Sequence, residues 1–564
     1  MYVLPSDSLR SVTRVQAALS APGMPFAVTA TRSGPRYTGG PATLRDLLDA
    51  TRAHGERPFL VTAGGALGYA EHHARVAALA HHLLDAYGLR PGQRVVIAMR
   101  NLPEWQIAFW AVQAAGLVAV PLNAWWEERE LAYALDDCGP ALVVADQERA
   151  ERIRPWFTRR AGTGPRLLTV GDRPRPGADR FEDLPAPTPG ADLPDVPLDP
   201  GGDATLIYTS GTTGRPKAVA ATRSAWCAAL LGPRFFAATA VLSAGGDLAG
   251  VPPQTTLMTY PFFHVAAFST LLPLMANGGT AVLMHRWDPA EALRLVDRHR
   301  VTMFVGVPTT ALGLLDAADR AGAGLPTLRV VSTGGAAAPP GLAARITARF
   351  GGRVEARNGY GLTETCGGVL ANLGARYREH PDSVGRPCPA VEVRIAGPDG
   401  SARPDGEVGE LLLRGQPLFR GYAGDPEATA AAFSDGWFRT GDLARLRDGE
   451  VYIVDRLKDM VVRGGENVYC VEVEGVLCDH PAVADAAVVG VPHPLLGEEV
   501  AAVVVLRTGA APDRDGLRSH VAGRLAAFKV PAHLVFHPGP LPRNPTGKLL
   551  KPALREQVAA LLPG

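Results

Sequence analysis

A nine-residue stretch rich in hydroxyl groups is the part of this sequence best suited to chemistry. It reads Thr209-Ser210-Gly211-Thr212-Thr213-Gly214-Arg215-Pro216-Lys217. Glycines let a backbone turn sharply so that its N–H groups converge on an anion, while the hydroxyls add donors and Lys217 adds charge. This composition favours phosphate binding, although the Walker A spacing cannot be laid over it. A solvated turn has the same composition, so the loop alone leaves both interpretations open.

Four further motifs downstream carry carboxylates, an aromatic ring and lysines in glycine-rich contexts. They are Asn358-Gly359-Tyr360-Gly361-Leu362-Thr363-Glu364, Gly436-Trp437-Phe438-Arg439-Thr440-Gly441-Asp442, Asp455-Arg456-Leu457-Lys458-Asp459 and Asn544-Pro545-Thr546-Gly547-Lys548. Carboxylate oxygens suit Mg²⁺ and sugar hydroxyls, and a lysine suits developing negative charge. Each motif alone is weak evidence, because turn aspartates and exposed lysines are common.

The elements that must position these motifs alternate between strands and helices. Apolar segments predict strands over 94–99, 118–122, 141–145, 205–209, 257–260, 280–284, 302–307 and 328–333, and helical patterns cover 103–116, 127–137, 289–299 and 339–350. Short apolar strands separated by helices are typical of parallel sheets covered on both faces. The hydroxyl-rich loop therefore follows a buried strand.

Two changes, one in composition and one in strand length, divide the chain. Residues 171–203 hold eight prolines and eight acidic residues, which predicts an extended surface connection. After about residue 392 the strands become short (393–395, 410–414, 451–455), and Asp448-Gly449 is a hairpin signal. The last hundred residues have a separate α+β pattern, with helices over 471–479 and 513–526 and strands over 484–491, 500–507 and 533–537.

Composition excludes several classes of protein. With 57 Lys+Arg against 56 Asp+Glu in 564 residues, no global basic field for nucleic acid exists. The six cysteines include no C-x-x-C pair, so a reducing compartment is the simplest interpretation. Residues 1–23 lack the apolar region of a signal peptide. The apolar stretch 107–122 is shorter than the roughly 20 residues of a membrane span, and a buried helix leading into a strand explains it better.

In their order and separation, the five motifs resemble the adenylate-forming (AMP-binding) superfamily of acyl-CoA synthetases, luciferases and nonribosomal peptide adenylation domains. The resemblance runs from about Thr43 to Arg555. The residues at 123–126 and 465–469 are most similar to those of bacterial fatty acyl-CoA synthetases. The resemblance implies an α/β fold: a large N-terminal domain of two doubly wound α/β subdomains plus a β-barrel, and a small mobile α+β C-terminal domain. We expect an N-terminal extension over 1–42, an AMP-binding domain over 43–456 and a C-terminal domain over 457–564, with a hinge at 456–459.

The activity implied by the resemblance is a two-step, Mg²⁺-dependent ligation. A carboxylic acid attacks the α-phosphorus of ATP to give an acyl-adenylate and pyrophosphate, and the thiol of coenzyme A then displaces AMP. Loading of a carrier-protein phosphopantetheine, or activation of an aryl acid, stays an alternative. Amino acids are less favoured, because peptide-synthetase domains usually carry an Asp where this chain has His264-Val265-Ala266-Ala267. A non-catalytic binding module would be expected to have lost Glu364, Asp442 or Lys548.

The resemblance also assigns roles to individual residues. Lys548, Glu364 and Thr363 would be catalytic, and Glu364 would also hold Mg²⁺. ATP and AMP would contact Thr209, Ser210, Gly211, Thr212, Thr213, Gly214, Lys217, Gly335, Ala336, Asn358, Gly359, Tyr360, Asp442 and Arg456. Lys458 would be the hinge, and Gly464 and Gly465 would line the tunnel for coenzyme A. The phosphate loop departs from most relatives in having Ala218 where they have glycine, a small change.

The acyl pocket would include His264, Val307 and Gly334. We interpret His264 as a pocket residue and not a base, because a histidine among aromatic residues is more often part of a core. The predicted wall stretches 303–307, 333–335 and 366–369 are small and apolar and contain no Lys or Arg. They favour a largely apolar monocarboxylic acid, such as a medium- or long-chain fatty acid. The expected partners are this small acid, ATP and coenzyme A, with a carrier protein as an alternative acceptor.

No nucleic acid and no integral membrane segment are expected. The location is predicted to be cytoplasmic, with peripheral attachment to a membrane left open, and the oligomeric state is left open between monomer and homodimer.

Overall fold

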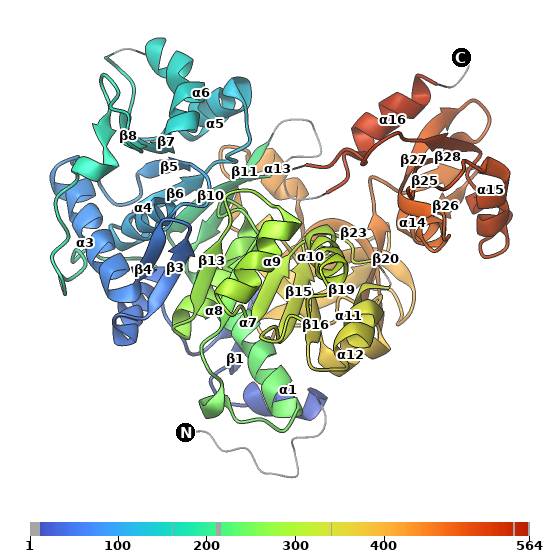
Figure 1. The fold of residues 1–564 in the computed structure, drawn as a ribbon, viewed down its shortest axis with the longest axis horizontal. Coiled ribbons are helices and arrows are strands. Elements are labelled where there is room, and N and C mark those ends of the chain that lie inside the picture. The colour runs from blue at the N-terminus through green and yellow to red at the C-terminus, as the bar shows by residue number, and fades with distance from the viewer. Residues whose placement is uncertain (1–11, 161, 210–215, 340, 545–547, 562–564) are drawn as a thin grey trace.

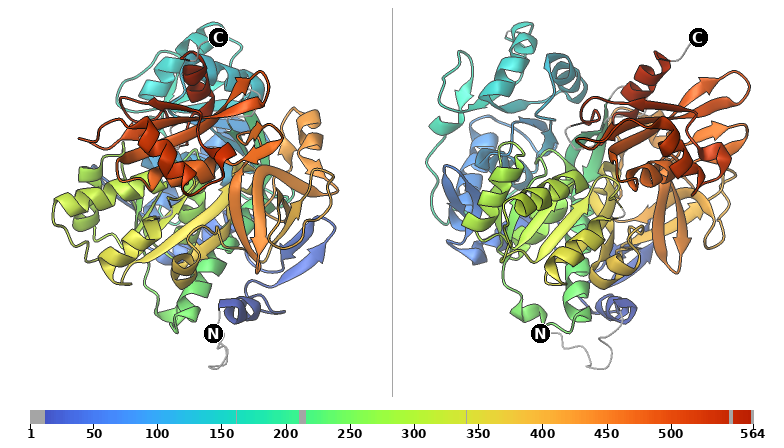
Figure 2. Two further views of the ribbon diagram at one scale, coloured as in Figure 1. Left: turned by 90° about the vertical axis from the view of Figure 1, so that its right-hand side faces the viewer. Right: turned by 45° about the vertical axis from the view of Figure 1, so that its right-hand side comes forward.

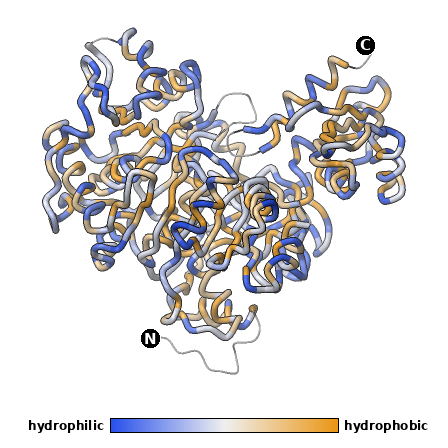
Figure 3. Tube along the Cα trace, in the orientation of Figure 1, coloured by the Kyte–Doolittle hydropathy of each residue, from blue (hydrophilic) through white to orange (hydrophobic). Residues whose placement is uncertain are grey.

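The protein folds into two large mixed sheets, a smaller antiparallel sheet and a separate C-terminal sheet (Figure 1). The computed structural model describes residues 12–160, 162–209, 216–339, 341–544 and 548–561. The N-terminal residues form helix α1 (Val12–Leu19) and a hairpin of β1 (Val28–Thr31) and β2 (Gly34–Tyr37). Hydrophobic residues concentrate inside the body and polar ones on its surface (Figure 3).

The first large sheet is parallel through most of its width. Its order is β21 (Gly421–Tyr422), β11 (Lys217–Thr222), β10 (Asp203–Thr209), β6 (Val118–Pro121), β5 (Arg94–Ala98), β7 (Leu142–Asp146), β8 (Arg166–Val170) and β9 (Asp179–Arg180). Strand β11 returns antiparallel to β10 and pairs Lys217 with Thr209, so both ends of the hydroxyl-rich loop lie side by side. Residues 210–215 of that loop lie outside the described part of the chain.

The second large sheet has a parallel centre with antiparallel edges. Its order is β18 (Arg386–Pro387), β17 (Gly367–Leu373), β16 (Glu355–Leu362), β15 (Val330–Gly334), β14 (Met303–Gly306), β12 (Thr255–Met258), β13 (Thr280–Leu283), β3 (Pro58–Thr62) and β4 (Gly65–Gly68). In register, Gly334 lies beside Gly359 and Asn358 beside Thr333. The predicted nucleotide-side residues thus gather at the same end of neighbouring strands.

Helices cover both faces of both sheets, as expected for doubly wound folds. The shared middle layer contains α2 (Leu44–Ala50), α3 (Tyr69–Asp85), α4 (Pro103–Ala114), α7 (Arg223–Ser243) and α8 (Val265–Ala276). The outer layers contain α5 (Glu128–Cys138) and α6 (Gln147–Thr158) on one side, and α9 (Pro289–Arg298), α10 (Pro308–Arg320), α11 (Leu342–Phe350) and α12 (Gly374–Glu379) on the other. Strand β5 needs cover on both faces because its side chains are apolar on both. Val95 and Ile97 face the middle layer, and Val96 and Ala98 face α5 and α6.

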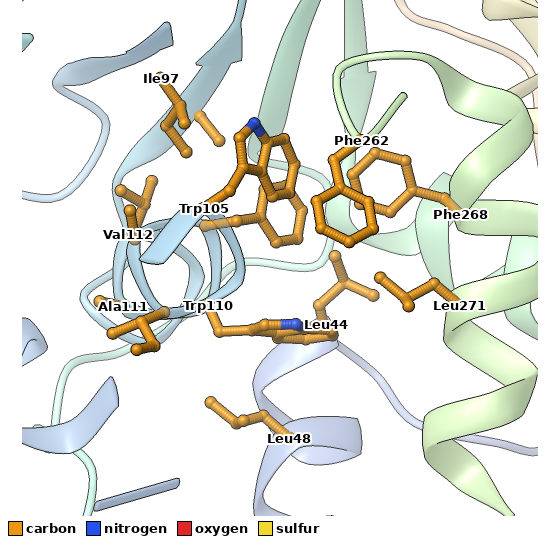
Figure 4. Close-up of a cluster of buried hydrophobic side chains, with 14 of the residues drawn as sticks. Leu44, Leu48, Ile97, Trp105, Trp110, Ala111, Val112, Phe262, Phe268 and Leu271 are labelled. Atoms are coloured by element: carbon orange, nitrogen blue, oxygen red, sulfur yellow. The ribbon is translucent and has the colours of Figure 1, made fainter. Parts of the chain in front are cut away.

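The middle layer explains the apolar stretch 107–122. Every residue of α4 from Trp105 to Ala114 is buried, and the stretch continues into the buried strand β6. Trp105 packs against Phe262, which lies between β12 and α8, and against Phe268 of α8. Trp110 lies near Leu44 of α2 (Figure 4). This helix is therefore one of the contacts between the two sheets.

The region in which we expected the β-barrel contains a five-stranded antiparallel sheet. This sheet contains β19 (Val391–Ala396), β20 (Val408–Gly415), β23 (Trp437–Arg447), β22 (Phe433–Ser434) and β24 (Glu450–Arg456). Helix α13 (Pro426–Ala431) comes directly before β22 in the chain. The predicted hairpin at Asp448-Gly449 is confirmed: both residues have positive φ, at 52° and 75°, between paired Arg447 and Glu450. This hairpin returns the chain so that Asp442 pairs with Arg456.

The C-terminal sheet stands apart from the main body (Figures 1 and 2). It contains β26 (Glu466–Val468), β25 (Val461–Arg463), β28 (Gly497–Leu506), β27 (Val483–His493) and β29 (His533–Phe536), with α14 (Cys470–Cys478), α15 (Arg514–Ala522) and α16 (Lys551–Ala559). Its first strand in chain order, β25, begins five residues after Arg456 ends β24, so the chain passes between the two parts through a short segment. Our domain boundary at 456–457 remains a proposal.

The longest helix, α7, was not predicted. Its sequence is apolar all round, so helical periodicity gives little signal. By length and composition it is the one helix of the described residues that could cross a membrane, but 67% of its apolar window is buried inside the protein. Helix α11 begins at Leu342 and not at 339, and α15 ends at Ala522 and not at 526.

Strands β16 and β17 approach so closely that a side chain is excluded at Gly361. A Cβ atom there would overlap the carbonyl of Gly367, whereas at Gly359 the nearest atom, the Leu370 oxygen, is 3.7 Å away. We expect Gly361→Ala to lower the midpoint of thermal unfolding, at a cost of about 1–3 kcal/mol for overpacking. The matched variant Gly359→Ala should remain close to wild type, and equal midpoints for the two variants would contradict this packing.

Candidate active site

One cavity of about 1300 Å³ brings most of the predicted site residues together. Those that line it are Thr209, Lys217, His264, Gly334, Gly335, Asn358, Gly359, Tyr360, Thr363, Glu364, Arg456, Lys458 and Lys548. They come from both large sheets, from the antiparallel sheet and from the C-terminal part of the chain. Residues separated by more than three hundred positions therefore share one wall.

Other predicted residues lie elsewhere. Ser210, Gly211, Thr212, Thr213 and Gly214 lie outside the described residues. Asp442 is buried behind the cavity wall, and Val307 lines a neighbouring small cavity of about 120 Å³ that shares Tyr260 and Trp125 with the large one. Ala336, Gly464 and Gly465 line neither cavity.

A buried carboxylate ties three of the motifs together. Tyr360 Oη donates to Asp442 Oδ2 at 2.6 Å, and Arg456 Nε lies 3.2 Å from Asp442 Oδ1. Burial, and then the charge of Asp442, raise the pKa of Tyr360 well above its ordinary value, so the phenol stays protonated and donates. Each carboxylate oxygen has a second lone pair, so Asp442 can still accept bonds from sugar hydroxyls.

Glu364 has a hydrogen-bond partner that the sequence did not reveal. Tyr422 Oη donates to Glu364 Oε1 at 2.9 Å, and Lys217 Nζ lies 5.0 Å from the centre of the Tyr422 ring. The tyrosine thus links the phosphate-loop lysine to the predicted metal ligand. Burial raises the pKa of Glu364 above its ordinary value, and the bond from Tyr422 opposes this shift.

The chemistry of Glu364 fits a single Mg²⁺ contact. A carboxylate in the wall of a large cavity supplies the hard oxygen that Mg²⁺ prefers. Among the described residues no cluster of three or more His, Cys, Asp or Glu forms a complete metal site. The remaining ligands would come from ATP phosphates and water, which is the usual pattern for Mg²⁺ with nucleotides.

Lys548 reaches the cavity from the C-terminal part of the chain. Its backbone N–H donates to Asn544 Oδ1 at 2.9 Å, and the Asn544 N–H donates back to the Lys548 carbonyl at 2.8 Å. Burial, and then the positive charge of Arg456, lower the pKa of Lys548 to about 8, while Asp442 and Glu364 act in the opposite direction. The ammonium therefore lies within the field of both carboxylates.

His264 has the properties of a fixed wall residue. It caps the N-terminus of α8, where its Nδ1 accepts from the Ala266 N–H at 3.2 Å. Burial, and then the charge of Lys548, lower the pKa of His264 to about 3, so the ring is neutral at neutral pH. A group with this pKa is a poor base near pH 7, which supports our interpretation of His264 as a pocket residue.

The segment around Lys458 is anchored to the C-terminal part of the chain. Asp459 and Met460 N–H groups both donate to the Arg456 carbonyl, at 2.9 and 3.1 Å, which makes a tight turn. Cys470 at the start of α14 donates its backbone N–H to Asp455 Oδ2 and its thiol to the Asp459 carbonyl, the latter at 3.0 Å. These two bonds hold the expected hinge on both sides of the exposed Lys458.

Gly464 and Gly465 have a backbone reason for being glycine. They form the two-residue turn between β25 and β26, where Arg463 pairs with Glu466, and their φ angles are 59° and 89°. Such turns need positive φ at both positions, which favours glycine and asparagine. A Cβ atom at Gly465 would meet nothing within 4 Å.

Part of the cavity wall is mainly apolar. Helices α7 and α8 supply Phe236, Ala237, Ala238, Val241, Ala266, Pro273 and Leu274, and the N-terminal extension adds Pro25 and Phe26. Phe26 packs edge-on against Phe235 of α7, with ring centres 5.6 Å apart. The sequence did not predict this wall, because α7 and the extension carry no motif.

Comparison with known proteins follows the same division of the chain. The family model described as AMP-binding enzyme matches residues 47–423, and the model of the AMP-binding enzyme C-terminal domain matches residues 472–548. A feruloyl-CoA synthase from Amycolatopsis is 39% identical over 499 residues, which are 88% of this chain and 94% of that protein.

Two further relatives extend this picture. The long-chain-fatty-acid–CoA ligase FadD13 of Mycobacterium tuberculosis is 34% identical over 501 residues, 87% of this chain and 94% of its own length. The crystal structure of ATP-bound MatB from Rhodopseudomonas palustris superposes with a TM-score of 0.80 at 30% identity and covers 91% of this chain and 99% of that one. The predicted superfamily and fold class are confirmed.

The pKa of Lys548 predicts a pH dependence. If the Lys548 ammonium acts in adenylation, its loss of a proton in the free enzyme should lower activity at alkaline pH. We expect kcat/KM for ATP, measured as pyrophosphate release that requires the carboxylic acid substrate, to fall about tenfold per pH unit above about pH 8. Lys548→Arg should remove this alkaline limb, because a guanidinium stays charged. The comparison uses the shape of the pH profile of kcat/KM, so it holds even if the variant has low activity. If the alkaline fall in kcat/KM is unchanged in Lys548→Arg, Lys548 is not the group that causes it.

Proposed function

Because the chain belongs to the AMP-binding enzymes, a family of adenylate-forming CoA ligases, we propose that it is an ATP-dependent acyl-CoA synthetase for an acid with an extended apolar body. We propose a medium- or long-chain fatty acid as that substrate, with Mg²⁺ and coenzyme A as the other reactants. The observation that carries the proposal is one cavity that is lined both by Lys548 and Glu364 and by apolar residues of α7 and α8.

The residues divide the first step between them. Asp442, held by Tyr360 and Arg456, would accept the ribose hydroxyls, and the hydroxyl-rich loop with Thr209 and Lys217 would surround the phosphates. Lys548 would stabilise the negative charge that develops as the acid attacks the α-phosphorus. Mg²⁺ on Glu364 would neutralise phosphate charge when bound.

The second step requires a different face of the C-terminal part of the chain. Lys548 lines the cavity, whereas Gly464 and Gly465 do not. This arrangement suits adenylation. Rotation about residues 456–459 would bring the β25–β26 turn to the cavity for thioester formation, and a short segment with few tethers suits such a hinge.

An aryl acid is a second candidate, because the feruloyl-CoA synthase is 39% identical to this chain. A panel of fatty acids and hydroxycinnamic acids, assayed for AMP release with coenzyme A or with a holo carrier protein, distinguishes the candidates. We expect the highest kcat/KM for a fatty acid with coenzyme A. Higher kcat/KM for a hydroxycinnamate, or release only with the carrier protein, would contradict this proposal. Cytoplasmic location and oligomeric state remain predictions.

The role of the glycine turn can be separated from its backbone geometry. Gly465→Asn keeps a residue that tolerates positive φ but adds a side chain, and Gly465→Leu adds a bulkier one. If this turn lines the path of the thiol, both variants should keep acid-dependent ATP–pyrophosphate exchange, and coenzyme A-dependent AMP release should fall more in the leucine variant. Normal acyl-CoA formation by Gly465→Leu would remove the turn from that path.

A further inference from the structure

Four arginines line the described part of the cavity, and three of them have a carboxylate partner. Arg456 pairs with Asp442, Arg439 with Glu410 and Arg357 with Glu355, each within 3.2 Å. The fourth, Arg234 on α7, has no ion pair or hydrogen bond to any described residue. Burial lowers the pKa of Arg234, and no charged side chain opposes this shift.

Arg234 belongs to the part of the cavity wall that α7 supplies. On α7 it precedes Ala237, Ala238 and Val241 by one to two turns, on the face that lines the cavity. Two residues earlier, a Cβ atom at Gly232 would lie 3.4 Å from Cys388 Sγ, and the Gly368 N–H of β17 donates to Ser269 Oγ of α8 at 2.9 Å. Arg234 thus lines the cavity from a helix that packs against α8 and β17.

The acidic side chains of the cavity are already engaged. Glu364 accepts from Tyr422, Glu410 pairs with Arg439, and Glu130 accepts from the Glu127 N–H at the start of α5. None of them is paired with Arg234, which is half-buried and lies beside the lining residues Pro233, Phe236 and Ala237 in the sequence. A half-exposed guanidinium keeps part of its hydration, and its N–H donors are available to a ligand that enters the cavity.

We infer that Arg234 binds a second carboxylate on the acyl chain, so that the acid is a fatty dicarboxylic acid. A guanidinium matches a carboxylate in a bidentate manner, and charge-assisted bonds of this kind are the strong ones. The inference rests on the proposed function and narrows its substrate class. It also revises the expectation of a monocarboxylic acid, which rested on three wall stretches that did not include α7.

The test uses acids matched in length on the full-length enzyme. Adipic, suberic and sebacic acids, their monomethyl esters, and hexanoic, octanoic and decanoic acids are compared by kcat/KM for coenzyme A-dependent AMP release. At one length or more we expect the diacid to exceed both neutral-ended acids by about 10- to 100-fold, the range of a charge-assisted contact. Arg234→Met should abolish this preference, and Arg234→Lys should keep part of it.

The preference is a ratio within one enzyme, so it does not depend on how much of a variant folds. Arg357→Met is the matched control: this arginine also lines the cavity but is paired with Glu355, and its loss should leave the ratio unchanged. A monoacid preference at every length, or a diacid preference that survives in Arg234→Met, overturns the inference alone. Failure of every acid to support pyrophosphate release overturns the proposed function itself.

Discussion

The structure depends on bringing opposite charges from distant parts of the chain into one poorly solvated space. Asp442 and Glu364 supply negative charge from the large domain, and Lys548 supplies positive charge from beyond the short segment at 456–459. Each charge alone would be costly to bury, and together with Tyr360, Arg456 and Tyr422 they offset one another. The doubly wound sheets position Tyr360 on β16 and Tyr422 on β21, and the antiparallel sheet positions Asp442 and Arg456.

The same constraint explains why the C-terminal part of the chain is linked by so few contacts. If Lys548 acts only in the first step, as we propose, it must enter the site and be able to leave it. The tight turn at Arg456 and the two bonds from Cys470 fix the segment in the arrangement observed, yet they are few enough to exchange. The glycine turn at 464–465 lies on the same small sheet and away from the cavity, so one domain has two distinct faces to present.

Sequence patterns predicted the framework well, because short apolar strands and the Asp448-Gly449 hairpin have local signals. Most of the predicted site residues that the structure describes also line the cavity. Tyr422, the α7 wall and Arg234 were not predicted, since each acts through tertiary contacts that no spacing encodes and α7 is apolar on every side. Gly464 and Gly465 show the converse: glycine suggested an open channel, and the structure adds a hairpin turn that requires positive φ.

The most direct test of this account is to measure the two half-reactions separately in Lys548→Ala. Loss of one preorganised cation should slow acyl-adenylate formation by roughly a hundredfold to a thousandfold. Conversion of preformed acyl-adenylate and coenzyme A to thioester should remain near the wild-type rate, because the phosphate bond is already made and another face of the domain acts. An equal fall in both half-reactions would contradict the account.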